Sequence, residues 1–335
     1  FDEEYTLPKN LSIVKLPTIG PKIYPISIKM GEYIEKFNPD VIYLKGIWRY
    51  TSFLAYNWKK QNPYKILILS PAGMLQKVPL QNKTILKKIS TFFIEKKLFK
   101  LCDLIHAVSE LEKDELIKSK LKFKKIIFIP EGIPGNNFLQ EAKNSKKETS
   151  NKRLITISRI DPIKGLELLL ESCQDIDFNG WQYFIYGNGE EKYINKIQRL
   201  IHKYNLTDKV KLHKGIFGDK KLKVLNESLA FILPSKSESF GISIAEAMLY
   251  GLPVITTTKT PWEIIKNNKL GWYIKPSKIE LKKSLQELFS LSKNEIEEIG
   301  SRAKSYISKR YDLMNTSERM KKEIIELSGL KNKYL

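Results

Sequence analysis

The chain has 335 residues, of which 42% are hydrophobic, 28% charged and 11% aromatic. This is the composition of a globular protein, and the length exceeds that of a usual single core, so two domains are expected. No apolar run reaches the roughly 18 residues that a membrane-spanning helix needs. The two cysteines, Cys102 and Cys173, exclude a disulfide scaffold and favour a reducing, cytoplasmic setting.

Charge is the unusual quantity of this sequence. Lys and Arg total 58 against 37 acidic residues, which gives a net charge of +21, and only seven of the 58 are Arg. Such a chain favours phosphates, nucleic acid or an anionic membrane as a partner, but lysines spread over every solvated face would give the same total. The lysines are concentrated: residues 51–100 hold ten of them and one acid, for +9. Nucleic acid is not an expected partner, because Arg is scarce and no zinc or RNA-recognition motif occurs.

Short apolar runs alternate with amphipathic stretches, which is the pattern of βαβ units and parallel sheets. In the first half, strands are predicted at 11–16, 41–44, 65–70, 104–108 and 126–130, and helices near 25–37, 50–61, 83–101 and 110–120. After a polar, linker-like segment at 135–152, strands are predicted at 153–158, 181–186, 210–213, 230–234, 253–257 and 272–274, and helices near 164–174, 191–204, 219–227, 242–250 and 277–290. The tail, 294–328, predicts two helices. Two doubly wound α/β domains follow, with ligands at the carboxyl ends of the strands and a cleft between the domains.

The densest motif comes directly after the strand predicted at 230–234. Glu238 lies in a loop, Gly241 opens a helix, and Glu246 lies one to two turns into that helix. Glycine lets a ligand approach the backbone there, and the free N–H groups of the first helical turn attract anions. A carboxylate inside the helix can accept two hydrogen bonds from a ribose diol. This context favours a nucleotide site over two solvated glutamates.

Three more clusters lie at the ends of predicted strands. Arg159 and Lys164 can hold a diphosphate by charge-assisted hydrogen bonds, although ordinary surface cations beside a helix are an alternative. The turn Gly187-Asn188-Gly189-Glu190 lacks the third glycine of the dinucleotide fingerprint, so a plain strand–helix turn explains it as well. The first half adds three strand-end residues that we expect to face the same cleft: Gly46, Ala72 and Gly73.

The order of these motifs resembles the family 4 retaining glycosyltransferases, which have the GT-B fold. The resemblance runs from about residue 35 to about residue 310 and rests on Gly46-Ile47-Trp48, Pro71-Ala72-Gly73-Met74, Arg159 with Lys164-Gly165, Gly187-Asn188-Gly189-Glu190, and Glu238 with Glu246. It implies two Rossmann-like domains facing across a cleft. We expect an acceptor-side domain at 1–140 whose opening strand is missing, a nucleotide-sugar domain at 150–310, and a helical tail at 311–335.

The resemblance also implies roles for the site residues. Glu246 would bind the ribose of a UDP- or GDP-sugar, and Glu238 would contact the donor sugar. Arg159 and Lys164 would neutralise the departing diphosphate. The other substrate-binding positions would be Gly46, Ala72, Gly73, Gly187, Gly189, Phe240, Gly241, Ile242 and Ser243. Neither a cofactor nor a metal is expected, because the cations and the helix N-terminus would stabilise the leaving charge, and no nucleophile is assigned.

Two positions depart from the family pattern. Family members usually have His where this chain has Lys45 and Ala72, and the second His normally helps to bind the donor hexose. Two interpretations follow. The first is an enzyme of surface-polysaccharide or lipopolysaccharide assembly that acts on a glycan or lipid-linked acceptor. The second is a degenerate sugar-nucleotide-binding module with little turnover.

The lysine-rich part of the first half also has two interpretations. Residues 85–101 predict an apolar and basic helix, which can lie on an anionic bilayer with about 1 kcal/mol from each well-placed Lys. The same helix can instead pack on the core and expose its lysines to water. The first interpretation predicts a cytoplasmic protein that docks on the inner face of the cytoplasmic membrane, and the second predicts no membrane contact.

Overall fold

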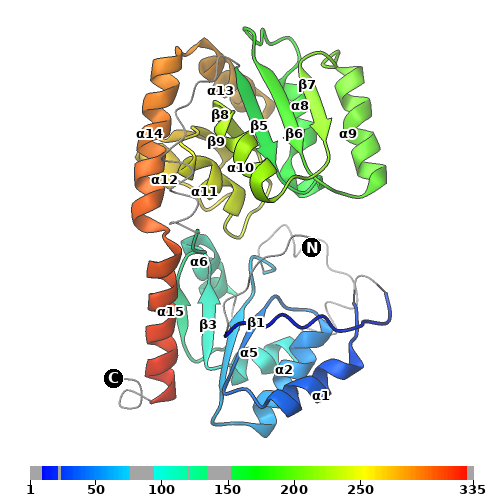
Figure 1. Cartoon of the computed structure of the whole chain (residues 1–335), viewed down its shortest axis with the longest axis vertical. Helices are drawn as coiled ribbons and strands as arrows, with labels where there is room; N and C mark the ends of the chain where they lie inside the picture. Colours follow the sequence, from blue (N-terminus) through cyan, green and yellow to red (C-terminus); the bar gives the residue numbers. More distant parts are fainter. Residues whose placement is uncertain (1–9, 22–23, 76–93, 120, 134–151, 330–335) are drawn as a thin grey trace.

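The computed structural model of the protein describes residues 10–21, 24–75, 94–119, 121–133 and 152–329. They form two α/β domains stacked along the long axis of the molecule, each built around a parallel sheet (Figure 1). Residues 85–93 of the predicted basic helix and nearly all of the predicted linker lie outside the described residues. Within the described residues, every helix is too short or too polar to cross a membrane.

In the part of the chain that the structure describes, four parallel strands in sequential order make the first sheet. They are β1 (Val41–Lys45), β2 (Ile66–Ser70), β3 (Leu104–Ala107) and β4 (Ile126–Phe128), and each lies within two residues of its prediction. The helices of this domain within the described residues are α1 (Ile28–Phe37), α2 (Tyr50–Gln61), α5 (Lys96–Leu101) and α6 (Glu110–Lys118). Apolar residues of β2 and β3 pack on α2 and α5 over one face of the sheet.

The strand predicted at 11–16 is wrong. Residues 11–18 pair with no strand, and the segment forms only an isolated antiparallel bridge between Ile19 and Ile26. Leu11 and Ile13 are 53% and 67% exposed. Alternating apolar residues make a strand only where a sheet edge accepts their backbone and a core covers one face. In the described chain this segment has neither.

Six parallel strands in the order β10-β9-β8-β5-β6-β7 make the second sheet. The chain begins in the middle at β5, adds β6 and β7 on one side, and then adds β8 to β10 on the other. The direction therefore switches between β5 and β8, where sheets of this kind bind ligands. The strands are β5 (Arg153–Ile157), β6 (Gln182–Tyr186), β7 (Val210–His213), β8 (Ala230–Leu233), β9 (Val254–Thr257) and β10 (Gly271–Ile274). The helices are η2 (Pro162–Lys164), α8 (Leu166–Ser172), α9 (Glu191–Lys203), α10 (Gly218–Asn226), α11 (Ile242–Leu249), α12 (Ile264–Asn267), α13 (Lys278–Ser290) and α14 (Lys293–Arg310).

The last two helices serve different domains. They form one column along both domains, orange to red in Figure 1, in which α14 packs on α11 of the second domain. The final helix, α15 (Leu313–Ser328), returns to the first domain. Its Met320, Ile324 and Leu327 pack against Ile66, Ile68 and Leu104 on the face of the sheet opposite α2. The core of the first domain is therefore completed by the C-terminal helix.

Replacing Ile324 and Leu327 together by Ala is expected to lower the free energy of unfolding of the first domain by about 2–3 kcal/mol, because both changes remove apolar contact area. Hydrogen–deuterium exchange should become faster in peptides that cover β2 and stay unchanged in peptides that cover β8. Met314→Ala is the matched control, since Met314 lies on the same helix and is 62% exposed. Unchanged exchange over β2 in the double variant would contradict this packing.

A buried ion pair stabilises the first domain near β2. Lys59 is 4% exposed, and its Nζ lies 2.7 Å from Asp103 Oδ2. Asp103 also binds Lys124 at 2.8 Å and accepts the N–H of Leu67 at 2.9 Å. Burial by itself would raise the pKa of Asp103, but the two ammonium groups and the amide outweigh it and hold the pKa below its usual range.

Asp103→Asn should lower the free energy of unfolding by about 3 kcal/mol at neutral pH, because it leaves a buried ammonium without its carboxylate. Since the folded state depresses the pKa of Asp103, this stabilisation is present above the pKa of the unfolded chain and is lost as the pH falls through the folded value. Denaturant titrations should therefore show the gap between wild type and variant narrowing below about pH 4. Asp208→Asn, at an exposed position, is the control, and a gap independent of pH would refute the assignment.

Candidate functional site

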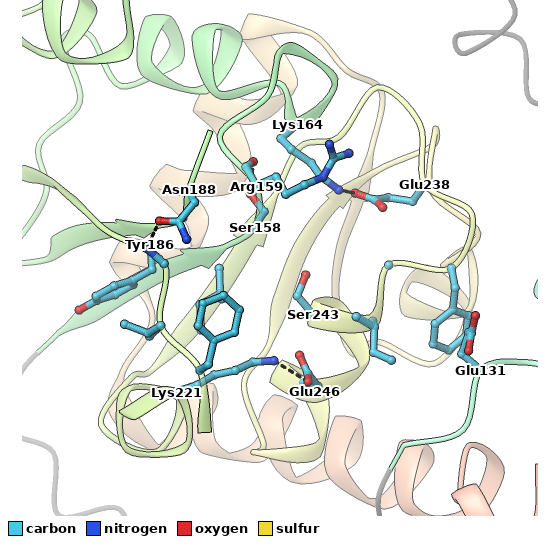
Figure 2. Close-up of a pocket in the computed structure, with 18 of the residues that line it drawn as sticks. Glu131, Ser158, Arg159, Lys164, Tyr186, Asn188, Lys221, Glu238, Ser243 and Glu246 are labelled. Atoms are coloured by element: carbon cyan, nitrogen blue, oxygen red, sulfur yellow. Dashed lines mark hydrogen bonds and ion pairs between the residues drawn. The ribbon is translucent and has the colours of Figure 1, made fainter. Parts of the chain in front are cut away.

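A pocket of about 470 Å³ lies where the second sheet changes direction, and the first domain bounds one side of it (Figure 2). This volume is within the range of small-molecule sites. The loops after β5, β6 and β8 and the start of α11 supply most of its lining, and the first domain supplies Lys45 and Glu131. Nine of the thirteen predicted site residues line it: Arg159, Lys164, Gly187, Glu238, Phe240, Gly241, Ile242, Ser243 and Glu246.

Lys164 and Glu238 face each other across one end of this pocket. Lys164 Nζ lies 2.6 Å from Glu238 Oε1, and the two side chains are 13% and 10% exposed. Ser235 Oγ donates to the same oxygen at 2.6 Å. Lys164 reaches this place because Asp161 caps η2 and Gly165 turns the chain at a φ of 72°. An ammonium and a carboxylate held in this way can bind a phosphate and a sugar hydroxyl, respectively.

Arg159 adds a second cation on the same side of the pocket. Its side chain is 73% exposed and lies 3.4 Å from Asp161. Figure 2 shows Arg159, Lys164 and Glu238 together on the side opposite Lys221 and Glu246. Two cations at one end of a pocket can share the charge of a single diphosphate.

The start of α11 adds backbone donors between these two ends. Gly241 precedes the helix at a φ of 83°, and a Cβ there would lie 3.2 Å from both Ile244 and Trp262. Ile242 and Ser243 line the pocket, and the N–H groups of a first helical turn have no intrahelical carbonyl to bind. With the helix dipole, these groups favour an anion at this point.

Phe240 supports this loop from behind. Its ring is 5% exposed and packs on Trp262 and Tyr311, with centroids 5.2 and 5.7 Å away. Trp262 Nε1 donates a hydrogen bond to the carbonyl of Phe240. Tyr311 lies where the chain crosses between the domains, and its carbonyl accepts the N–H of Ile133 at 2.8 Å. The buried ring anchors the loop, and what Phe240 offers the pocket is mainly its backbone.

The opposite end of the pocket contains residues that the sequence analysis missed. Lys221, in the first turn of α10, lies 2.6 Å from Glu246 Oε1, yet no local pattern links two residues 25 positions apart. Tyr186 and Phe217 also line the pocket. Asn188 had a visible signal, since it stands between the two predicted glycines, and its Oδ1 accepts the N–H of Gly215 at 2.9 Å.

Gly187 and Gly189 are required for close packing between two loops. A Cβ at Gly187 would lie 2.0 Å from the carbonyl oxygen of Ser158, and one at Gly189 would lie 2.2 Å from that of Ile160. The loop after β6 therefore packs directly on the loop after β5. Gly187 still lines the main pocket, whereas Gly189 lines a neighbouring one. Both positions shape the wall of the site.

Gly46, Ala72 and Gly73 lie outside the lining of the pocket. All three have a positive φ, of 91°, 52° and 77°. Gly73 packs on Ser239, where a Cβ would lie 2.6 Å from the Cβ of the serine. Its N–H is held at 2.5 Å by the buried carboxylate of Glu112. Because Ser239 lines the pocket, this turn acts on the site through the loop that carries Glu238.

The first domain contributes an ion pair to the pocket. Lys45 Nζ lies 2.5 Å from Glu131, and the side chains are 53% and 29% exposed. Lys45 ends β1 and Glu131 follows β4, so both lie at the carboxyl edge of the first sheet. The lysine at the position where the resemblance would place a histidine therefore lines the pocket and has an acidic partner of its own.

The two cysteines and His106 are buried groups outside the lining of this pocket. Burial raises the pKa of both Cys102 and Cys173 to about 12, which leaves the thiols protonated and unreactive at neutral pH. His106 bonds the hydroxyl of Tyr43 at 2.6 Å and the carbonyl of Ile129 at 2.7 Å. Among the described residues, no group of three His, Cys, Asp or Glu side chains is arranged to hold a metal ion.

Two facing parallel α/β domains define the GT-B fold, and comparison with solved structures confirms it. Sucrose-phosphate synthase from Thermosynechococcus elongatus matches with a TM-score of 0.76, over 90% of this chain and 77% of its own, at 18% identity. HepE from Anabaena, in complex with UDP and glucose, matches with a TM-score of 0.73, over 90% of this chain and 82% of its own, at 15% identity.

The chain belongs to the glycosyl transferases group 1 family, whose family model matches residues 137–306. A probable sucrose-phosphate synthase of Thermosipho melanesiensis is 31% identical over 222 residues, which cover 63% of this chain and 49% of that protein. The putative colanic acid biosynthesis glycosyltransferase WcaL of Escherichia coli is 27% identical over 187 residues, which cover 53% of this chain and 45% of that protein. The match thus spans about half the length of these relatives.

Proposed function

We propose that the protein is a retaining, metal-independent glycosyltransferase that uses a UDP- or GDP-sugar as donor and a glycan or lipid-linked molecule as acceptor. The observation that carries this proposal is the pocket in which Arg159, Lys164, Glu238, the start of α11 and Glu246 meet. Family membership supports it, as do the UDP complexes of HepE and of the pneumococcal O-GlcNAc transferase GtfA. The likeness to WcaL supports a role in surface-polysaccharide assembly.

The pocket divides the proposed reaction between its two ends. Glu246 accepts the ribose hydroxyls, while Arg159, Lys164 and the first-turn N–H groups of α11 neutralise the diphosphate. As the bond to the sugar breaks, negative charge grows on that diphosphate, and preorganised cations stabilise it most in the transition state. Lys164 acts on the diphosphate from its place beside Glu238, and that carboxylate accepts a sugar hydroxyl. Lys45 and Glu131 face the acceptor from the first domain.

A donor screen tests the proposal. The full chain is incubated with a panel of UDP- and GDP-sugars, with and without lipid-linked glycan acceptors, and nucleotide binding and release are measured. We expect one donor to bind and to release its nucleotide faster when an acceptor is present. Absence of both binding and release across the panel would refute the proposal.

Peripheral membrane association is a separate part of the proposal, supported by the excess of lysine in residues 51–100, in which the buried Lys59 takes no part. Lys-rich surface attracts anionic lipid at low salt, and the attraction weakens as salt screens it. Co-sedimentation with vesicles that contain anionic lipid should exceed that with neutral vesicles and should fall with added salt. Equal sedimentation with both vesicle types would remove the membrane from the proposal.

The second candidate is a sugar-nucleotide-binding module with little turnover, and Ala72 is the observation that favours it. Ala72 occupies the position of the family's donor-binding histidine at a φ of 52°, which histidine adopts more readily than most residues. If the module is degenerate, Ala72→His should raise the rate of nucleotide release without tightening nucleotide binding. Ordinary turnover by the native protein would exclude this candidate.

A further inference from the structure

The contact between Lys221 and Glu246 is not explained by the catalytic roles above. The ammonium lies 2.6 Å from Oε1, and the two side chains are 21% and 15% exposed. Lys221 lines the pocket, whereas its neighbour Lys220 is exposed and does not. Figure 2 shows the side chain of Lys221 extending to the carboxylate of Glu246. This lysine is therefore part of the site by position.

The second oxygen of Glu246, a residue that lines the pocket, has an unmet hydrogen-bonding capacity. Glu246 Oε2 is buried and has no hydrogen-bond partner among the described residues. A buried carboxylate oxygen without a donor is costly, so a ligand hydroxyl that donates to it gains that energy. Lys221 fixes Oε1 and so restricts how the carboxylate can turn to meet a donor.

Charge gives a second argument from the same contact. A nucleoside diphosphate brings several negative charges into the pocket, and a bare carboxylate in a site shielded from water would repel them. The ammonium of Lys221 neutralises Glu246 locally, so the carboxylate can accept hydroxyls without opposing the diphosphate at the other end.

We infer that Lys221 is a positioning residue that orients and neutralises Glu246, so that the site selects a donor carrying an intact ribose diol. The inference rests on the proposed function, because it requires that a nucleotide binds this pocket. It predicts that Lys221 controls discrimination between ribose and its deoxy forms more than it controls contacts to the phosphates.

The test compares the affinity of UDP with that of 2′,3′-dideoxy-UDP by calorimetry, with GDP and its dideoxy form as a second pair. Lys221→Met should weaken UDP binding about tenfold, as expected for a lost hydrogen bond to a charged group, and should reduce the preference for the diol toward that of Glu246→Gln. The double variant, Lys221→Met with Glu246→Gln, should bind UDP no more weakly than Glu246→Gln alone. Lys221 acts through Glu246, so the two effects on affinity should not add. Lys221→Arg should restore most of the preference.

Lys220→Met is the matched control and should leave both affinities unchanged. Full diol preference in Lys221→Met, or tighter UDP binding, would overturn the inference while leaving the proposed function intact. If the wild-type protein binds neither UDP nor GDP, the proposed function fails first. A merely structural role for Lys221 would change both ligands equally, which would also overturn the inference.

Discussion

Lys164→Ala is expected to lower the rate of sugar transfer at least about a hundredfold. Preorganised groups that meet charge developing in a transition state contribute roughly a hundred- to a thousandfold to the rate. In the proposed reaction Lys164 is such a group, because it is 13% exposed, is held 2.6 Å from Glu238 and lines the same pocket as the start of α11. Arg159 is far more exposed and is expected to contribute less.

Steady-state kinetics with the donor identified in the screen can measure this effect. The loss should fall mainly on kcat, because the lysine acts on charge that grows as the bond breaks, and Lys164→Arg should recover part of it. Lys236→Ala provides a control cation, since Lys236 is exposed and lies close to Glu238 in the chain. A variant that changes only KM would show that Lys164 binds the ground state and the transition state equally.

Gly165→Ala should destabilise the second domain by about 2–4 kcal/mol, since it combines left-handed backbone strain with overpacking. Gly165 has a φ of 72°, and a Cβ there would lie 2.2 Å from the carbonyl oxygen of Pro234. Pro234 directly follows β8 and begins the loop that carries Glu238. Any shift that relieves the clash moves this loop away from Lys164, so donor binding should weaken as well.

Gly180→Ala separates the effect of left-handed backbone strain from the effect of overpacking. Gly180 has a similar φ of 78°, but a Cβ there would meet no atom within 4 Å. It should therefore show the strain alone, about 1 kcal/mol, with donor binding unchanged. Thermal unfolding and nucleotide titration of both variants can check this, and equal destabilisation by the two changes would show that the contact with Pro234 is unimportant.

The sequence predicts the second domain more completely than the first. Its strands are short apolar runs between turn signals, and its site residues come directly after them, so periodicity and local motifs were sufficient. Glu238, Gly241 and Glu246 lie within one strand–loop–helix unit, and the structure brings all three to the same pocket. The helix α12 was missed because its four residues are too few to show a period.

Long-range contacts account for what the sequence could not predict. Residues 11–16 have the alternation of a strand, but no sheet edge in the described chain accepts them. Lys221 joins Glu246 only because α10 and α11 follow strands on opposite sides of β5. The two tail helices were predicted, but the domain on which each of them packs was not. That depends on which sheet face has no other helix over it, and a local sequence pattern does not encode this.

The position of α15 has a consequence for synthesis of the chain. Arg319 of this helix donates to the carbonyl of Phe128 in β4, a residue 191 positions earlier. A growing chain therefore makes all four strands of the first sheet long before the helix that covers one of their faces leaves the ribosome. The second domain can fold in that interval, since its own sheet and helices are consecutive. Of these two domains, the one made earlier is finished later, and until α15 docks, Ile66, Ile68 and Leu104 lack the apolar side chains that cover them in the folded protein.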